Sequence, residues 1–545
     1  MHKLLSIILL IIPVFLFAQE DIDTTKYRRI EIIHSNTLNV NNITGPEIKV
    51  LIGEVEFYHD SATMYCDSAY FNSKKNQFIA YSNIQIIKPS DIDTVQLYGD
   101  SLFYDGLSKM AKVRSSVILS KADMLLTTDS LDYDLNNDVG YYSNGGRTEN
   151  GEDTLISNFG YYYSKKNELF FKENVKIINP DYTITSDTLM HNLKSKVSNF
   201  YGPTEIVSDS NYIYCENGWY NHDKDISQFN QNAFLESKET SIKGDSLFYD
   251  RKNGIGKAYR NVVIKDTVQD ILLYGNEGYY FEKTERSMMT DRALFVQIYE
   301  GDSLFLHADT LRTQIDTSYA NNDTITYRFI RAYNKVKLYS PSFQAKCDSL
   351  IYTMLDSVIQ MYTLPVLWSE ENQLTAKYIE MKMVNNEINQ VDMTDSTLIV
   401  SQKDSIRFDQ ILGQTMIGYI ADNELYQVDV GGETQTIYFI KDFDFLMGVN
   451  KVTSNSMIIY LKDNKVDKIW FYTQPKGIIY PPFALADTEL YLPGFQWLDE
   501  FRPKSSKDVF IWKNETVETT ENQNIETIID ENIENINNLN NNLND

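Results

Sequence analysis

The sequence has few basic residues, few histidines and only three cysteines. Its 50 Lys and Arg are outnumbered by 76 Asp and Glu, and a nucleic-acid partner would require clustered positive charge. The six histidines show no metal-ligand spacing and no nucleophile partner, and no glycine-rich phosphate loop is present. We therefore predict that the protein is not an enzyme, with no catalytic residue, metal, cofactor or nucleic-acid partner.

Long apolar runs are also missing after the first residues. Leu4 to Phe17 is apolar, follows Lys3 and precedes Ala18, which is the order of a secretory signal peptide. The run is shorter than the roughly 20 residues of a membrane-spanning helix, although an uncleaved anchor remains an alternative. No cysteine follows before Cys66, so a lipoprotein processing site is excluded. We predict a signal peptide over residues 1–18 and an exported chain that is soluble or held to a membrane through partners.

Aromatic and β-branched residues are abundant, and they recur with a fixed period. A small residue followed by Asp, Asn or Glu stands at Thr128, Ser157, Ser186, Cys215 and Gly244, so the spacing is 29 residues each time. Thirteen residues after the acidic or amide position comes an apolar column that includes Phe171, Phe200 and Phe229. Alternating segments such as Asn174-Val175-Lys176-Ile177 follow, and a period of two indicates strands.

Short polar segments separate these columns and have the composition of turns. Each unit of about 29 residues is then a pair of strands that must stack on its neighbours to bury its apolar face. We predict an all-β, elongated repeat array over residues 50–400, with residues 19–49 as a lead-in. The polar stretch from Asp316 to Thr326 is expected to be a loop. Residues 401–503 are expected to form a C-terminal β region, either a cap or a continuation, and the Asn-rich residues 504–545 a disordered acidic tail.

Two columns of the repeat contain residue types that can take part in chemistry, cysteine in one and aspartate in the other. Cys66, Cys215 and Cys347 share the column of small residues, so we interpret them as small buried hydrophobes rather than as a disulfide or a metal site. Asp followed by Ser or Thr commonly caps a bend through side-chain to backbone hydrogen bonds. We prefer that structural interpretation of the Asp column over a catalytic one.

The repeat resembles a known family. Gly99-Asp100-Ser101-Leu102-Phe103-Tyr104, together with Asn261-Val262-Val263-Ile264 and the stretch from Gly413 to Pro482, is similar to the OstA/LptA-like lipopolysaccharide-transport family. The resemblance implies a bent sheet, described as a β-taco or β-jelly roll, with acyl chains in its groove. It also implies a periplasmic protein that carries lipopolysaccharide and stacks by its sheet edges on other transport proteins, including the outer-membrane translocon. Self-association is an open possibility, and this chain is several times longer than the short periplasmic members.

We expect the groove to be lined by the apolar columns, namely by Ile84, Ile86, Val113, Phe171, Val175, Ile177, Phe200, Ile206, Phe229, Val262, Ile264 and Met289. Regular inward columns are equally typical of a closed, filled core. A closed β-solenoid would instead suggest an extracellular polysaccharide-acting enzyme or a surface interaction array. The family resemblance favours the groove.

Overall fold

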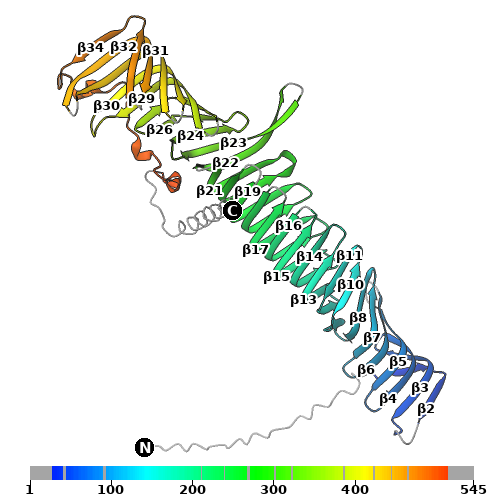
Figure 1. The fold of residues 1–545 in the computed structure, drawn as a ribbon. Helices are drawn as coiled ribbons and strands as arrows, with labels where there is room; N and C mark the ends of the chain where they lie inside the picture. The colour runs from blue at the N-terminus through cyan, green and yellow to red at the C-terminus, as the bar shows by residue number, and fades with distance from the viewer. Residues whose placement is uncertain are drawn as a thin grey trace, which may run out of the picture. The chain divides into compact units, whose positions relative to one another are not determined.

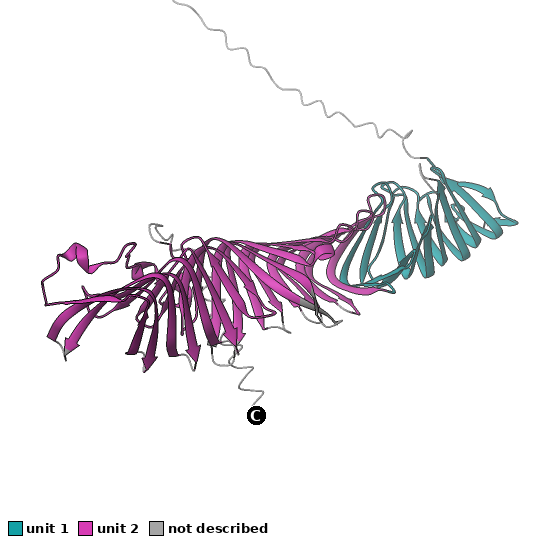
Figure 2. Cartoon of the chain, turned by 90° about the horizontal axis from the view of Figure 1, so that it is seen from above, with its two compact units in different colours: residues 1–180 teal, residues 181–545 magenta. Residues whose placement is uncertain are grey.

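The computed structural model describes residues 28–512, except for 41–44, 90–93, 210, 238–239, 267–269, 300–301, 321–322, 385–386, 422–423, 443–444 and 463–464. The expected signal peptide lies outside the described residues. The chain divides into two compact units, residues 1–180 and 181–545, which are coloured separately in Figure 2. Strands dominate both units and the only helices described are short 3-10 turns, so the all-β prediction is confirmed.

Unit 1 is a meander of antiparallel strands. Its elements are β1 Glu31–His34, β2 Thr37–Val40, β3 Ile48–His59, β4 Ala62–Asn72, β5 Gln77–Pro89, β6 Thr94–Asp105, β7 Met110–Lys121, β8 Met124–Asp134, β9 Val139–Tyr142, β10 Gly146–Asn150, β11 Asp153–Ser157, β12 Phe159–Tyr163 and β13 Glu168–Ile178.

Unit 2 continues the same pattern within itself (Figure 1). Its elements are β14 Tyr182–Asn192, β15 Val197–Ser208, β16 Asn211–Asn221, β17 Ile226–Ser237, β18 Thr240–Asp250, β19 Ile255–Asp266, β20 Ile271–Phe281, η2 Glu282–Thr284, β21 Arg286–Tyr299, β22 Asp302–Ala320, β23 Asp323–Tyr339, β24 Gln344–Thr353, β25 Val358–Tyr362, β26 Val366–Ser369, β27 Asn372–Thr375, β28 Tyr378–Val384, β29 Glu387–Gln402, β30 Phe408–Ala421, β31 Glu424–Asp442, β32 Phe445–Lys462, β33 Lys465–Tyr472, β34 Lys476–Tyr480, η3 Asp487–Leu490, η4 Asp499–Phe501 and η5 Ser506–Phe510.

Most long strands bend near their middle, and the bend has a repeated cause. Pairs of consecutive residues adopt positive φ, such as Ser82-Asn83 in β5 and Arg260-Asn261 in β19, and the strand register shifts at these pairs. Asn tolerates the left-handed conformation better than most residues, and an extra residue of this kind bends a strand. At some bends one strand is divided into two elements, as in β25 and β26, which both pair with β24.

The Asp column stabilises this bend. Asn83 donates a hydrogen bond from Nδ2 to Asp67 Oδ2 at 2.8 Å, and Asn261 does the same to Asp245 Oδ1 at 3.2 Å. The predicted role at a bend is therefore correct, but the partner is the side chain of the left-handed residue on the next strand rather than a backbone group.

The small-residue column lies at the inner side of the bend. A Cβ atom on Gly99 would lie 2.4 Å from a side-chain carbon of Val113, so bulk is excluded there. Cys66, Cys215 and Cys347 occupy this column with free, buried thiols, which confirms their interpretation as small buried residues. Burial raises the pKa of Cys66 and of Cys215 to about 12.

Two sequence expectations need correction. The polar stretch from Asp316 to Thr326 is not a loop: except for 321–322 it extends the hairpin of β22 and β23, with Asp316 paired to Tyr327. The expected start of the tail at residue 504 is too early, because η5 follows it and Val509 is fully buried. The last described strand ends at Tyr480, and residues from 481–512 pack on the sheet without forming strands. Residues 513–545 lie outside the described part of the chain.

Candidate functional site

Because the strands bend, unit 1 and unit 2 each have two walls that face one another. We call wall A the part of each strand beyond the bend that contains Ile86 in β5 and Ile206 in β15. Wall B is the part that contains Phe78 in β5 and Phe200 in β15. Side chains alternate along each strand, so each wall has an inner face towards the other wall and an outer face. The space between the inner faces is the trough.

The residues predicted to line a groove all belong to the inner faces. Phe200 is in register with Leu189 and Gly218, and Phe229 with Gly218 and Leu247. They therefore form one continuous lane on wall B. Ten of the twelve predicted residues are buried, whereas Ile206 and Ile264 are half-buried. All six predicted residues in unit 1 are buried, and both half-buried residues belong to unit 2.

In unit 1 the trough is filled by its own side chains. Phe57 on wall A stacks on Phe78 on wall B with ring centroids 4.1 Å apart. His59 on wall A lies with Nδ1 2.7 Å from the hydroxyl of Tyr104 on wall B. Ile84, Ile86, Val113, Phe171, Val175 and Ile177 are therefore core residues of unit 1.

Ion pairs also close the rim of unit 1. Lys109, in the turn after β6, pairs with Asp60, in the turn after β3. Lys88 at the end of β5 pairs with Asp138 beside β9. Each pair joins wall A to wall B, so the open side of this trough is bridged by charge.

The beginning of unit 2 is different. From β14 to β19, wall A carries a ladder of aliphatic side chains in register, namely Ile184, Ile206, Ile213, Leu235, Ile242 and Ile264. All except Ile184 remain half-exposed. Burial of apolar surface is favourable, so this stretch of trough offers a lane that the protein itself does not cover.

Wall B of the same stretch carries a second, polar lane, farther from the bend than the lane of Phe200 and Phe229. His191, Ser198, Tyr220, Ser227 and Tyr249 are in register on the inner face. In unit 1 the equivalent lane holds Phe71, Phe78, Tyr104, Ala111 and Tyr133. The trough from β14 to β18 is therefore amphipathic, which the expectation of an apolar groove did not include.

Hydrogen bonds organise this polar lane. Ser198 Oγ lies 3.0 Å from both His191 Nδ1 and His222 Nε2. Tyr220 donates to Asp225 at 2.8 Å, and Tyr249 donates to Glu282 at 2.7 Å. Burial, followed by the neighbouring carboxylate, raises the pKa of both tyrosines to about 12. Their hydroxyls therefore stay protonated near neutral pH.

Two contacts close the trough further along unit 2. Arg328 Nη1, on the wall B side of β23, donates to Asp266 Oδ2 at the wall A end of β19, at 2.9 Å. Tyr352 on wall B donates to Gln297 on wall A at 3.2 Å. These cross-wall contacts lie between the amphipathic stretch and the strands that follow β24.

A pocket opens between the walls from β26 to β31. It encloses roughly 820 Å³, including space that is open to solvent, and it is lined by Leu367, Leu374 and Ile399 from wall A and by Val391, Met393, Met416 and Val428 from wall B, among others. Ile388, Ile420 and Leu425 add an apolar rim. Wall A also contributes the polar residues Ser369 and Asn372, with Glu370 between them, so most but not all of the lining is apolar. None of these residues was among the predicted groove residues, although the alternation of Val391 and Met393 was a usable signal.

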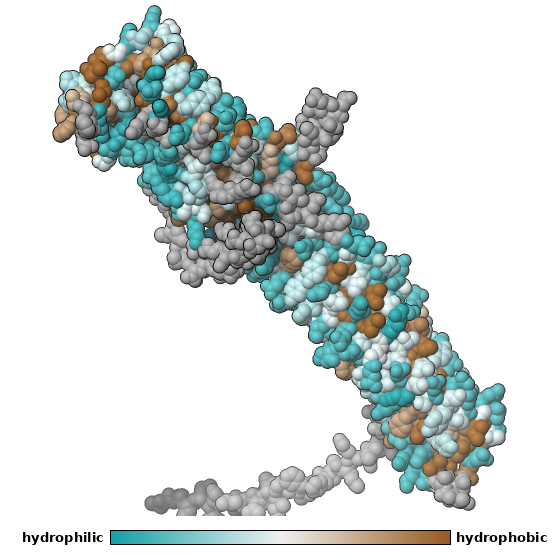
Figure 3. Space-filling view, viewed as in Figure 1, coloured by the Kyte–Doolittle hydropathy of each residue, from teal (hydrophilic) through white to brown (hydrophobic). Residues whose placement is uncertain are grey.

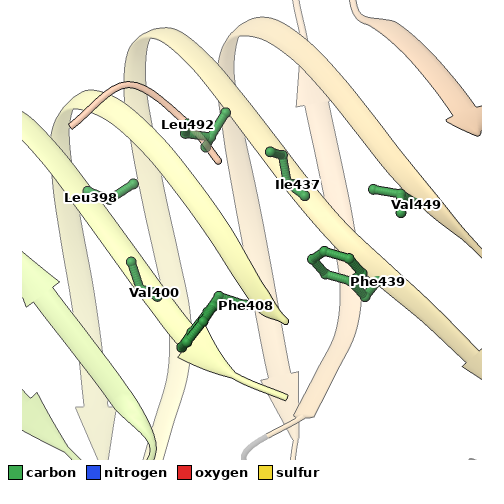
Figure 4. Close-up of a cluster of buried hydrophobic side chains, with 7 residues drawn as sticks. All are labelled: Leu398, Val400, Phe408, Ile437, Phe439, Val449 and Leu492. Atoms are coloured by element: carbon green, nitrogen blue, oxygen red, sulfur yellow. The ribbon is translucent and has the colours of Figure 1, made fainter. Parts of the chain in front are cut away.

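The outer face of wall A carries a second apolar surface, covered by the chain's own C-terminal segment. We call residues 481–512 the strap, which runs orange to red beside the sheet in Figure 1. Leu492 packs against a cluster on β29 to β32, which Figure 4 shows beneath it, consisting of Leu398, Val400, Phe408, Ile437, Phe439 and Val449. Val509 packs in the same way on β20 to β22.

Three buried glutamines fix the strap. Gln373 Nε2 donates to Gln496 O at 2.7 Å and its Oε1 accepts from Leu498 N at 2.7 Å. Gln410 makes an equivalent pair of bonds, and Gln344 Oε1 accepts from Arg502 Nε at 2.7 Å. The strap therefore crosses the strands in the order opposite to the sequence.

Comparison with known proteins gives one family match. Residues 27–187 match the family model described as OstA-like protein. The chain carries an OstA-like region. The matched residues cover unit 1 from residue 27 onwards and the first residues of β14.

A comparison with solved structures gives a more distant likeness. One of them is the crystal structure of LptH from Pseudomonas aeruginosa, described as the LptA homologous periplasmic component of the lipopolysaccharide transport device. It is 16% identical, with 20% of this chain and 81% of that chain covered and a TM-score of 0.19. A search of curated proteins finds no match.

The described residues contain neither a membrane-spanning helix nor a metal-binding cluster. Within 28–512, gaps aside, no helix is long and apolar enough to cross a membrane. Over the same residues, no group of three or more His, Cys, Asp or Glu is arranged to hold a metal ion.

Proposed function

We propose that the protein is a non-enzymatic carrier of lipopolysaccharide in the periplasm, with acyl chains held in the trough of unit 2. The observation that carries the proposal is the pocket between β26 and β31, because aliphatic and methionine side chains from both inner faces make up most of its lining. Pockets for apolar ligands have this composition, and methionine adapts to irregular hydrocarbon. The OstA-like region supports the substrate class.

The two units have different roles in this proposal: unit 1 is structural and unit 2 binds the ligand. Unit 1 is a packed scaffold, since its trough is filled and its rim is bridged by ion pairs. We therefore propose the groove lining for unit 2, where Ile206 and Ile264 are half-buried on the inner face of wall A. Phe200, Phe229, Val262 and Met289 also lie on the inner faces, but they are buried by the protein itself. Shielding of acyl chains by Ile206 and Ile264, over this buried base, is part of the proposal.

Photocrosslinking tests the site directly. Met416 faces into the pocket, whereas the next residue, Ile417, faces outwards on the same strand. A benzophenone amino acid at position 416 should crosslink to purified lipopolysaccharide, and the same group at position 417 should not. Equal crosslinking at both positions, or none at position 416 in a folded protein, would contradict the proposal.

Partners are proposed at the sheet edges. At the end of unit 2, β33 and β34 each pair with β32, and nearby Trp470, Ile478 and Ile479 are exposed by 54%, 56% and 65%. Figure 3 shows apolar side chains among polar ones at this end. Exposed edge strands with apolar side chains favour pairing with another chain. We propose that this edge stacks on another transport protein, such as the outer-membrane translocon, or on a second copy of the chain.

The proposed domain plan follows from these assignments. The signal peptide over residues 1–18 remains a proposal, as does the division into an array over 50–400 and a C-terminal β region over 401–503. Export to the periplasm would be tested by N-terminal sequencing of the mature protein recovered from the envelope. A mature chain that starts at Gln19 would support it, and a chain that retains Met1 would contradict it.

A further inference from the structure

The amphipathic stretch of the trough has two unlike inner faces, one with a half-buried aliphatic ladder and one with a polar lane whose serines are buried. The aliphatic ladder on wall A includes Ile213 and Leu235, and the polar lane on wall B includes Ser198 and Ser227. The pocket beyond β24 shows that the same fold can place apolar residues on both walls. The polar lane is therefore not a requirement of the bend or of the strand pairing.

A plain hydrocarbon does not suit this stretch. Covering hydroxyl and imidazole groups with an alkyl chain removes water without supplying hydrogen bonds, which is unfavourable. A ligand with hydrogen-bonding groups along one side of its hydrocarbon would satisfy both walls. Its hydrocarbon would lie on the ladder, and its polar groups would meet the lane.

We infer that the trough from β14 to β18 is a subsite for the hydroxyl- or amide-bearing part of an amphiphile, recognised by the polar lane of wall B. The inference deepens the proposed lipid-carrier function and depends on it. It distinguishes a polar subsite, centred on Ser198 and Ser227, from the apolar pocket centred on Met416.

The position of the tyrosines agrees with this role. Tyr220 and Tyr249 direct their protons to the rim carboxylates Asp225 and Glu282. The phenol oxygen of Tyr249, which is both a donor and an acceptor, is thereby left with acceptor capacity for a ligand hydroxyl or amide proton, whereas the phenol oxygen of Tyr220 also accepts a hydrogen bond from Arg251. The rim pairs also orient the rings along the lane.

The experiment uses the full chain and two probes of equal length, myristic acid and β-hydroxymyristic acid, each displacing a fluorescent fatty acid. The wild-type protein should bind the hydroxylated probe roughly five- to tenfold more tightly, the effect of about one hydrogen bond. The double variant Ser198→Ala/Ser227→Ala should lose this preference while it retains affinity for myristic acid. Ser241→Ala, on the outer face of β18, is the matched control and should behave like the wild type.

The outcomes separate the two proposals. If both probes bind equally to the wild-type protein, or if the double variant keeps the preference, the polar subsite is wrong and the carrier function stands. If neither probe displaces the fluorescent fatty acid, the carrier function itself is wrong. Ile213→Asp should weaken both probes alike, because it removes the hydrocarbon wall and leaves the polar lane.

Discussion

The side-chain amide of Gln410 makes two hydrogen bonds to the backbone of the strap. Its Oε1 accepts from Leu492 N at 2.7 Å, and its Nε2 donates to Leu490 O at 2.8 Å. Gln410 itself is fully buried. A single side chain thus replaces the backbone ladder that a strand would have supplied, which explains how a segment without strand structure is held on the sheet.

Replacing Gln410 should release the strap. Gln410→Leu leaves a buried backbone donor and acceptor without partners, at a cost of about 1–3 kcal/mol for each unsatisfied group. We expect faster amide exchange over residues 488–494, measured by hydrogen–deuterium exchange. Gln414→Leu, at an exposed position of the same strand, is the control. Unchanged exchange in the Gln410 variant would show that packing of Leu492 alone holds the strap.

Stability should rise with pH through one buried lysine. Burial, followed by the charge of Lys346, lowers the pKa of Lys337 to about 8, while Asp508 opposes the shift. Because the unfolded chain keeps its proton up to its ordinary pKa of 10.5, it binds more protons than the folded state between these values, and stability increases as pH rises through that window. Lys337→Met should remove this increase, measured as Tm at pH 7.5 and 9.5. An identical pH dependence in both proteins would contradict the assignment.

The bend should discriminate between residues at position 83. Asn83 has φ of 52° and donates to Asp67. Asn83→Val places a β-branched residue in a left-handed conformation and should lower the free energy of unfolding by about 1–3 kcal/mol, whereas Asn83→Gly should cost less, since glycine adopts positive φ freely. Urea denaturation measures both. Equal losses would indicate that the hydrogen bond, rather than the conformation, matters at the bend.

An aspartate introduced into the trough should have different effects at a buried position and at a half-buried position. Phe200 is 1% exposed beside Gly218, so Phe200→Asp should destabilise unit 2 by several kcal/mol, as an unpaired buried charge does. Ile213 is half-exposed, so Ile213→Asp should leave the strand spectrum native and lower only lipid affinity. Circular dichroism and probe displacement together separate the two results. A native Phe200→Asp protein would mean that this lane is solvated in solution.

The sequence predicts the strands, the 29-residue spacing and the burial of the small column, because each depends on local alternation and on a bend that recurs at one position. It also contained the difference between the units: two residues before the apolar column stand Phe78 and Ala111 in unit 1 but Ser198 and Ser227 in unit 2. What it did not reveal is whether opposite walls touch, because the stacking of Phe57 on Phe78 depends on the separation of the walls rather than on either strand.

Sequence patterns also could not predict the strap, because its position depends on contacts between distant parts of the chain. Its contacts join residues far apart in the chain, such as Gln373 with Gln496 and Lys337 with Ile511. No periodicity marks a segment that is held by side-chain amides. The apolar pocket was missed because its lining residues belong to strands where the repeat spacing becomes irregular.

The strap also sets an order of events during synthesis. Strands pair with neighbours in sequence, so the sheet of unit 2 can form as the chain emerges, but the outer face of β20 to β32 has no cover until residues 485–510 have been made. During that interval a newly made chain displays Leu272, Phe305 and Phe439 to proteases and chaperones. A chain that stops at residue 480 would display them permanently, so proteases and chaperones would distinguish a finished molecule from a truncated one by its exposed apolar face.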